Sequence, residues 1–145
     1  MLIRGWILAV LLAYGPLVYA ALEVRRRIHE AMGLTLAVVN ARFAKPLDAR
    51  LIGAELARQP VVFTLEDHVE AGGFGSAVLE LARSRAELNA NRVEVIALPD
   101  RFIDHGQRCE QLADAHMDID QLTARVSERL SAVRRSAPVR LVTRP

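Results

Sequence analysis

The order of apolar and amphipathic segments predicts an α/β fold, with helices on both faces of a mostly parallel sheet. Short apolar runs rich in β-branched residues alternate with longer segments in which apolar residues recur every three or four positions. Strands that are buried on both faces consist of continuous apolar runs of this kind. Right-handed crossovers then place the helices in two layers around the sheet. The predicted strands cover residues 7–14, 34–40, 60–65 and 93–98.

The N-terminal apolar segment, residues 5–22, contains no charged residue. Its length is compatible with a single membrane span. Gly15 and Pro16 interrupt the segment, however, and an apolar stripe continues beyond the charged residues that would end a span. We therefore expect a strand, a tight turn and an amphipathic helix, with no membrane contact. The stripe consists of Leu17, Ala21, Val24, Ile28 and Met32.

Start and stop signals define the next elements. Gly33 suits the C-cap of the first helix, because glycine adopts the left-handed conformation without penalty. Residues 41–47 form a connector that contains Pro46, and Asp48 is placed to cap a helix that runs to residue 57. The apolar residues of this helix are expected to face inward: Leu51, Ile52 and Leu56.

Three further helices are predicted in the C-terminal half. Gly72 and Gly73 open the first, a short helix over residues 110–115 follows the fourth strand, and Asp118 is placed to cap the last. The basic residues 139–145 form either an edge strand or a loose tail. The core-facing residues of the two longer helices are expected to be Ala77, Val78, Leu81 and Ala82, and then Ile119, Leu122, Val126, Leu130 and Val133.

Composition limits the functions that this chain of 145 residues can have. Its apolar share of 52% and charged share of 25% are ordinary for one globular domain and argue against disorder. Lys and Arg exceed Asp and Glu by only 19 to 17, and aromatic residues make up 5%. We therefore expect neither the positive field nor the stacking platform that nucleic-acid binding needs.

Cysteine and histidine usage argues against a disulfide or a metal site. Cys109 is the single cysteine, and a structural zinc site would need several Cys or His ligands at short spacing. The histidines are scattered instead, so no metal is expected, and the single cysteine fits a cytoplasmic location. They are His29, His68, His105 and His116.

The run from residue 66 to residue 76 allows three interpretations. A glycine-rich turn that opens a helix can bind an anion through free backbone N–H groups, but the acidic residues of the run would repel phosphate. Glu66, Asp67 and His68 could form an acid–base set. The favoured interpretation is that Gly72 and Gly73 let backbone segments approach closely at a domain or subunit contact.

The run from residue 98 to residue 106 follows the last predicted strand, which Pro99 ends because it cannot donate to a ladder. Asp100, Asp104 and His105 could form a carboxylate–imidazole pair. The favoured interpretation is that they cap a helix start, while Phe102 and Ile103 anchor the loop on the core.

Three stretches resemble one enzyme family. They are VNARFAKPLD at 39–48, residues 65–80 around GGFGSAVLE, and LPDRFIDHG at 98–106. Together they are similar to the C-terminal domain of 1-deoxy-D-xylulose-5-phosphate synthase, a thiamine-diphosphate enzyme of the transketolase superfamily. The match covers about residues 9–133, with Asn40 in place of a usual acidic residue. The family-motif positions are Arg42, Pro46, Asp48, Glu66, Gly72, Gly73, Phe74, Gly75, Pro99, Asp100, Phe102, His105 and Gly106.

The resemblance implies a five-stranded sheet in three α/β/α layers, with one strand antiparallel to the rest. The parent enzyme joins pyruvate to glyceraldehyde 3-phosphate on the methylerythritol phosphate route to isoprenoids. Its thiamine diphosphate and Mg²⁺ are held by the two preceding domains, and this chain has no Gly-Asp-Gly…Asn cofactor motif. We therefore expect no catalytic, cofactor-binding or metal residues in this chain. The motif positions serve structure and interfaces.

The implied role is to brace the catalytic domains and the enzyme's dimer contact. The chain would then be a fragment, a truncated product or one subunit of a split enzyme, and inactive alone. The expected organisation is an atypical segment at 1–8, the domain at 9–135 and a basic tail at 136–145. Two alternatives remain: the C-terminal domain of a transketolase or pyruvate dehydrogenase β-type enzyme, and a stand-alone module that dimerises through residues 72–76.

Overall fold

The protein is an α/β domain built on one sheet of four parallel strands. The computed structural model describes residues 7–136. The strands lie in the order β2-β1-β3-β4. Their bounds are Ile7–Ala13 for β1, Thr35–Asn40 for β2, Val61–Val69 for β3 and Val93–Leu98 for β4.

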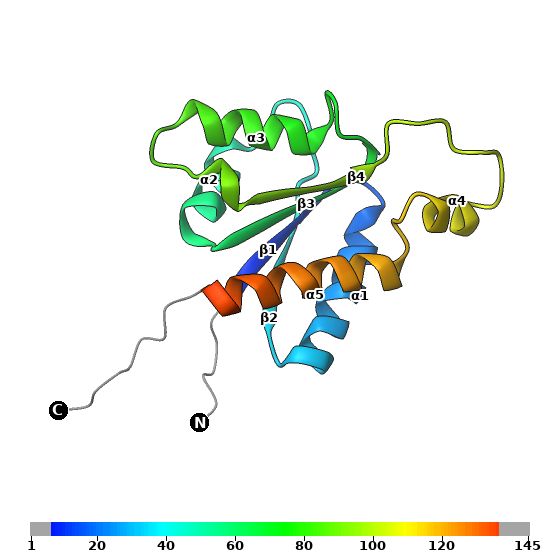
Figure 1. Ribbon diagram of the computed structural model, residues 1–145. Coiled ribbons are helices and arrows are strands. Elements are labelled where there is room, and N and C mark those ends of the chain that lie inside the picture. Colours follow the sequence, from blue (N-terminus) through cyan, green and yellow to red (C-terminus); the bar gives the residue numbers. More distant parts are fainter. Residues whose placement is uncertain (1–6, 137–145) are drawn as a thin grey trace.

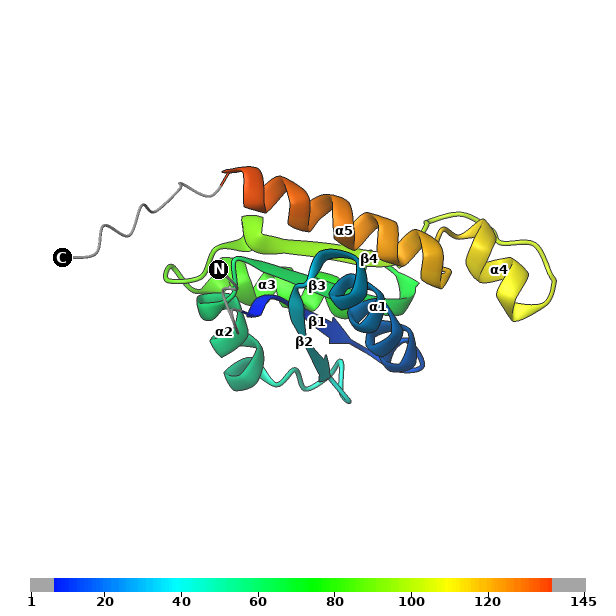
Figure 2. The same cartoon turned by 90° about the horizontal axis from the view of Figure 1, so that it is seen from below.

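Helices cover both faces of the sheet, as the alternating pattern predicted (Figures 1 and 2). Helices α1 (Leu17–Met32) and α5 (Ile119–Ser136) pack on one face, and α2 (Ala49–Arg58) and α3 (Phe74–Ser84) on the other. Helix α4 (Arg108–Asp114) lies beyond the end of β4 and α5, and a short 3₁₀ turn, η1 (Ala90–Arg92), precedes β4. The three-layer α/β/α class predicted from the sequence is confirmed.

The two central strands supply the core of both faces, because successive side chains of a strand point to opposite sides. On β1, Leu11 and Ala13 pack beneath α1 and α5, whereas Val10 and Leu12 pack beneath α2 and α3. Every described side chain of β1 is fully buried, including that of Ala9. This explains why the strand is a continuous apolar run in the sequence.

The described residues correct the expected sheet in two respects. Their strands number four, all parallel, whereas five with one antiparallel were expected from the resemblance. Strand β3 also continues to Val69 instead of ending at Leu65, so Glu66 and Asp67 lie within a strand and not in a loop. The predicted edge strand or tail at 139–145 lies outside the described residues.

The apolar N-terminal segment forms a strand and a helix, as expected. Gly15 makes the turn between β1 and α1 with a φ of 65°, and the stripe of α1 is buried at Leu17, Ala21, Val24 and Ile28. Within residues 7–136, no helix is both long enough and apolar enough to cross a membrane.

Local signals for the helix ends are confirmed. Gly33 is the left-handed C-cap of α1, and its N–H donates to the carbonyl oxygen of His29. The Asp48 carboxylate accepts a hydrogen bond from the Leu51 N–H at 2.9 Å and so caps α2. The prediction that Leu51 faces inward is wrong, because its side chain is 38% exposed.

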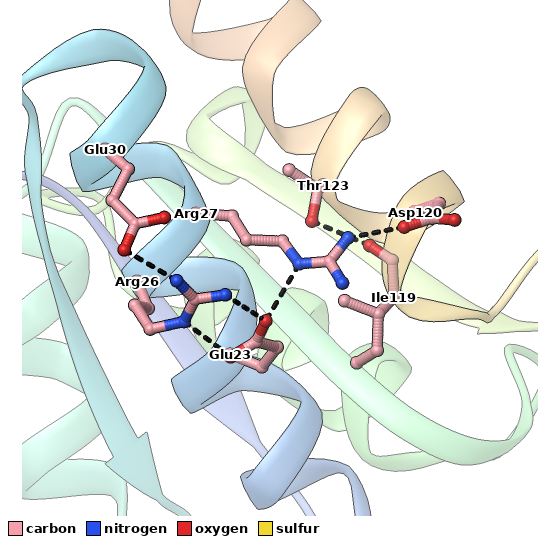
Figure 3. Close-up of polar contacts among 7 residues, drawn as sticks. All are labelled: Glu23, Arg26, Arg27, Glu30, Ile119, Asp120 and Thr123. Carbon is pink, nitrogen blue, oxygen red and sulfur yellow. Dashed lines mark hydrogen bonds and ion pairs between the residues drawn. The ribbon is translucent and has the colours of Figure 1, made fainter.

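Charged side chains join α1 to α5 on the surface (Figure 3). The Glu23 carboxylate accepts from Arg26 at 2.7 Å and from Arg27 at 2.8 Å, both on α1. Arg27 also reaches across to pair with Asp120 at the start of α5. Hydrogen bonds from the two guanidinium groups lower the pKa of Glu23 to about 2. We call Glu23, Arg26, Arg27 and Asp120 the α1–α5 clasp.

Candidate functional site

The candidate site is the carboxyl edge of the sheet, where all four parallel strands end. Open α/β sheets bind their ligands at this edge, beside the point where the strand order reverses. Here that point lies between β1 and β3, and just past the end of β1 the Tyr14 N–H donates to the carbonyl oxygen of Leu65 on β3 at 2.8 Å. The three family-like stretches all reach this edge, since each follows or ends one of the strands.

The centre of the edge is filled by one buried carboxylate. Glu66 is only 1% exposed, and its side chain points at the N-terminus of α3. Its two oxygens accept hydrogen bonds from the Phe74 N–H at 2.6 Å and the Gly75 N–H at 2.7 Å. Burial raises the pKa of the Glu66 carboxyl, against the opposing effect of these two bonds. The Thr64 hydroxyl, also buried on this face, has no hydrogen-bond partner among the described residues.

The glycines of this turn make room for that carboxylate. A Cβ on Gly73 would lie 2.6 Å from the Val69 carbonyl oxygen and 2.8 Å from the Glu66 carboxyl carbon. A Cβ on Gly75 would lie 2.7 Å from the Thr64 hydroxyl oxygen. Gly72 has a φ of 73°, which side chains rarely tolerate. A close approach is therefore found at these glycines, and the groups that they approach belong to strands β3 and β4 of this chain.

The other two interpretations of the run are wrong. The first-turn N–H groups of Phe74 and Gly75 already bind an internal carboxylate, so they are not available to an external anion. Glu66, Asp67 and His68 do not form an acid–base set, because each has a different partner: both oxygens of Glu66 accept from the start of α3, and the His68 ring lies 2.8 Å from the Val69 carbonyl oxygen. The Asp67 carboxylate pairs with Arg108 at 2.6 Å, and His68 is exposed.

The loop after β2 carries the first family stretch and is largely exposed. Arg42 has a φ of 57°, and its N–H donates to the Asn40 side chain at 3.0 Å. The Lys45–Pro46 peptide bond is cis. Phe43 is 61% exposed, although it is a large apolar residue. The loop ends at Asp48, the N-cap of α2.

The loop after β4 differs from the prediction. Phe102 does not anchor it on the core, because this side chain is 101% exposed. Ile103 does pack against the core, as expected. Helix α4 is capped by a reciprocal pair, Gln107 and Glu110.

The prediction that the polar residues of this motif cap a helix is wrong, because Gln107 and Glu110 cap α4. Instead, Asp100, Asp104 and His105 are exposed, and so is Gly106 at the end of the stretch. Pro99 is half-buried.

Two features of the carboxyl edge of the sheet were not predicted from the sequence. Phe43 and Phe102 are two of the four phenylalanines of the chain, and both are exposed at this edge, whereas Phe63 and Phe74 are buried. The pairing of Asp67 with Arg108 was also missed. The available signal was that both exposed phenylalanines lie beside Arg, Lys or Asp and outside any apolar run.

Across the residues described, no three His, Cys, Asp or Glu side chains gather so that they could hold a metal ion. A hollow of about 690 Å³ lies along the outer edge of β4, and both acidic and basic side chains line it. There Arg125 donates to the Val95 carbonyl oxygen at 2.9 Å, which covers part of the free strand edge.

Comparison with known proteins points to one family. A model described as the transketolase C-terminal domain matches residues 8–122. The 1-deoxy-D-xylulose-5-phosphate synthase of Pelotomaculum thermopropionicum is 39% identical over 133 residues, which are 92% of this chain and 21% of that protein. The same enzyme of Syntrophotalea carbinolica is 45% identical over 118 residues, which are 81% of this chain and 18% of that protein. This chain thus spans about a fifth of these relatives.

A solved structure of similar fold is described as a split gene transketolase in an inactive β4 tetramer. Its TM-score is 0.71 at 26% sequence identity, and the match covers 85% of this chain and 39% of that one.

Proposed function

The chain belongs to the transketolase C-terminal domain family, and from this premise we propose that it is the non-catalytic C-terminal domain of a 1-deoxy-D-xylulose-5-phosphate synthase. In this role it braces the catalytic domains and the enzyme's dimer, either as part of a longer polypeptide or as one subunit of a split enzyme. The domain covers residues 9–135, flanked by segments 1–8 and 136–145. The assembled enzyme, a homodimer in the cytoplasm, condenses pyruvate with glyceraldehyde 3-phosphate for isoprenoid synthesis.

The observation that carries this proposal is the exposure of Phe43 and Phe102 at the edge where the family-like stretches gather. Aromatic side chains are enriched at protein interfaces and depleted on free surfaces. The synthase relatives are between four and five times as long as this chain. A larger polypeptide is therefore the natural cover for these two side chains.

The cofactor of the parent family does not fit this chain. Thiamine diphosphate needs a diphosphate site with Mg²⁺, and the backbone N–H groups at the start of α3 are already bound to Glu66. The described residues also hold no metal-ligand cluster. We place the cofactor and all catalytic residues in the companion domains.

A domain exchange tests the proposal. The matching C-terminal segment of the Pelotomaculum synthase is replaced with residues 7–136 of this chain, and synthase activity and oligomeric state are measured. We expect the chimera to assemble and to be active. Deletion of the same segment is the control and should abolish both properties. A well-folded chimera that neither assembles nor reacts contradicts the proposal.

A second candidate is a stand-alone homo-oligomer without activity. The similar split gene transketolase assembles as an inactive β4 tetramer, which favours this alternative. Sedimentation of the isolated chain distinguishes the two: a stable oligomer at micromolar concentration supports self-assembly, and a monomer supports dependence on a companion.

A further inference from the structure

A 20-residue segment, residues 99–118, connects the end of β4 to the start of α5. We call it the arm. It contains α4, and both views show it projecting beyond the carboxyl edge, away from the rest of the sheet (Figures 1 and 2). It includes the third family-like stretch.

The inner side of the arm is packed on the domain. Ile103 and Leu112 contact the core cluster beneath α1 and α5. Ala115 and Met117 are buried within that cluster, at 4% and 2% exposure. The arm is therefore attached to the domain by apolar contacts along much of its length.

Polar contacts fasten the tip of the arm at several points. The Arg101 guanidinium pairs with the Asp114 carboxylate at 2.7 Å and donates to the Asp114 carbonyl oxygen at 2.9 Å. The Gln111 side chain donates to the Asp104 carbonyl oxygen at 3.1 Å. Arg108 pairs with Asp67 on β3. These contacts hold the backbone on both sides of Phe102.

Phe102 therefore has a defined position although its side chain touches almost nothing. At 101% exposure it is the most exposed of the large apolar residues described. We propose that Phe102 is the anchor by which the arm docks into an apolar pocket of the catalytic polypeptide of a 1-deoxy-D-xylulose-5-phosphate synthase. This inference rests on the proposed function. Because the backbone beside Phe102 is already fixed, docking has to order only the torsions of the phenylalanine side chain.

Two observations favour the catalytic polypeptide over a second copy of this chain. About four-fifths of the length of the synthase relatives lies outside this chain, so a covering polypeptide is available. Within the part of the chain whose burial is described, the exposed large apolar residues are dispersed over α1, α2 and two loops: Tyr19, Leu22, Phe43, Leu51 and Phe102. A stable self-contact needs roughly 800 Å² from each partner.

The test compares thiol labelling at two exposed aromatic positions. Phe102→Cys and the matched control Tyr19→Cys, which lies on α1 and is 81% exposed, are each made with Cys109→Ser. Both are labelled with a small maleimide in the isolated chain and in the chimera described above, and the labelled peptides are quantified by mass spectrometry. We expect equal rates in the isolated chain. In the chimera, only the Phe102→Cys thiol should react at least tenfold more slowly.

The Phe102→Cys substitution could itself abolish docking, so a second measurement uses thermal stability in place of labelling. Phe102→Asp should leave the thermal midpoint of the isolated chain unchanged, because the side chain makes no packing contact there, and should lower the midpoint of the chimera. Tyr19→Asp should change neither.

The outcomes separate the two proposals. If the chimera is active and assembled but Phe102→Cys reacts at the isolated-chain rate, or Phe102→Asp leaves the chimera unchanged, the anchor is refuted and the proposed function stands. Concentration-dependent protection in the isolated chain would assign Phe102 to a self-contact and also overturn the inference. A chimera that fails to assemble refutes the proposed function and the anchor with it.

Discussion

At the scale of single residues, the most informative contact is between Glu66 and the start of α3. A helix N-terminus usually attracts an anion because its first N–H groups lack partners. In this chain the anion is a side chain from the neighbouring strand, bound at 2.6 Å and 2.7 Å. Gly73 and Gly75 are required by that carboxylate and its surroundings. Their role is close packing within the domain.

Gly75→Ala tests this interpretation. Alanine is usually better than glycine inside a helix by about 0.5–1 kcal/mol. At position 75, however, the new methyl group would lie 2.6 Å from Val95 Cγ1 and 2.7 Å from the Thr64 hydroxyl oxygen. Overpacking of this kind costs roughly 1–3 kcal/mol. We expect urea unfolding to show a net loss of stability.

Gly53→Ala is the matched control, because Gly53 is also buried and helical. Its new methyl group would meet only the end of the flexible Arg85 side chain, with Nη1 at 3.0 Å and Cζ at 4.0 Å. This variant should be neutral or slightly stabilising. Equal behaviour of the two variants would contradict the packing role of Gly75.

At the scale of elements, short-range signals and long-range contacts together position the helices. Asp48 caps α2 within its own segment. Helices α1 and α5, in contrast, are joined by the α1–α5 clasp, whose Arg27–Asp120 pair connects residues far apart in the sequence. Apolar burial beneath both helices forms their main contact, and the clasp adds a surface interaction of small size.

The clasp predicts a dependence of stability on pH. The folded-state pKa of Glu23 is lowered from 4.5 to about 2. Its stabilising contribution is therefore complete above the unfolded-state pKa and is lost as the pH falls through the folded-state value. Parent and Glu23→Gln should differ in thermal midpoint at pH 6 and converge near pH 2. A difference that is independent of pH would rule out this electrostatic origin.

The α2 cap predicts a stability loss of ordinary size. Asp48→Ala removes the acceptor of the Leu51 N–H and should lower the free energy of unfolding by about 1 kcal/mol. Asp48→Asn keeps an acceptor oxygen and should retain most of the stability. Denaturant titration of both variants measures the effect. An alanine variant as stable as the parent would show that the cap contributes nothing.

At the scale of the whole molecule, the sheet edge that usually carries function is closed at its centre and exposed at its two sides. Glu66 and the glycine turn fill the centre beside β3. Phe43 and Phe102 lie on the loops that follow the outer strands β2 and β4. This arrangement suits contact with another polypeptide better than binding of a small molecule.

The whole-molecule prediction concerns thiamine diphosphate. In titration calorimetry with Mg²⁺, the isolated chain should give no saturable heat, because its described residues offer no metal-ligand cluster and Glu66 already occupies the Phe74 and Gly75 N–H groups at the start of α3. The intact Pelotomaculum synthase serves as the positive control. A micromolar Kd for the isolated chain would require a cofactor site of its own.

Most of the fold could be predicted because its signals are local. The apolar runs of β1 to β4, the stripe of α1, the Gly33 C-cap and the Asp48 N-cap each depend on residues close together in the chain. The end of β3 could not be predicted, since Glu66 and Asp67 look like loop residues until their partners on α3 and α4 are known. The burial of Leu51 was predicted wrongly for a similar reason. Helical periodicity shows which face of a helix points toward the core, but it does not show how much of that face other elements cover.

The sequence by itself determined the class of the fold, the order of its layers and the family, because hydrophobic periodicity and short motifs are carried by neighbouring residues. Only the tertiary structure decided which groups are covered. An acidic residue such as Glu66 is buried because α3 brings two N–H donors to it, and an apolar residue such as Phe102 stays outside because no element of the domain reaches it. Burial depends on what lies opposite a side chain in space, and linear sequence does not record that neighbour.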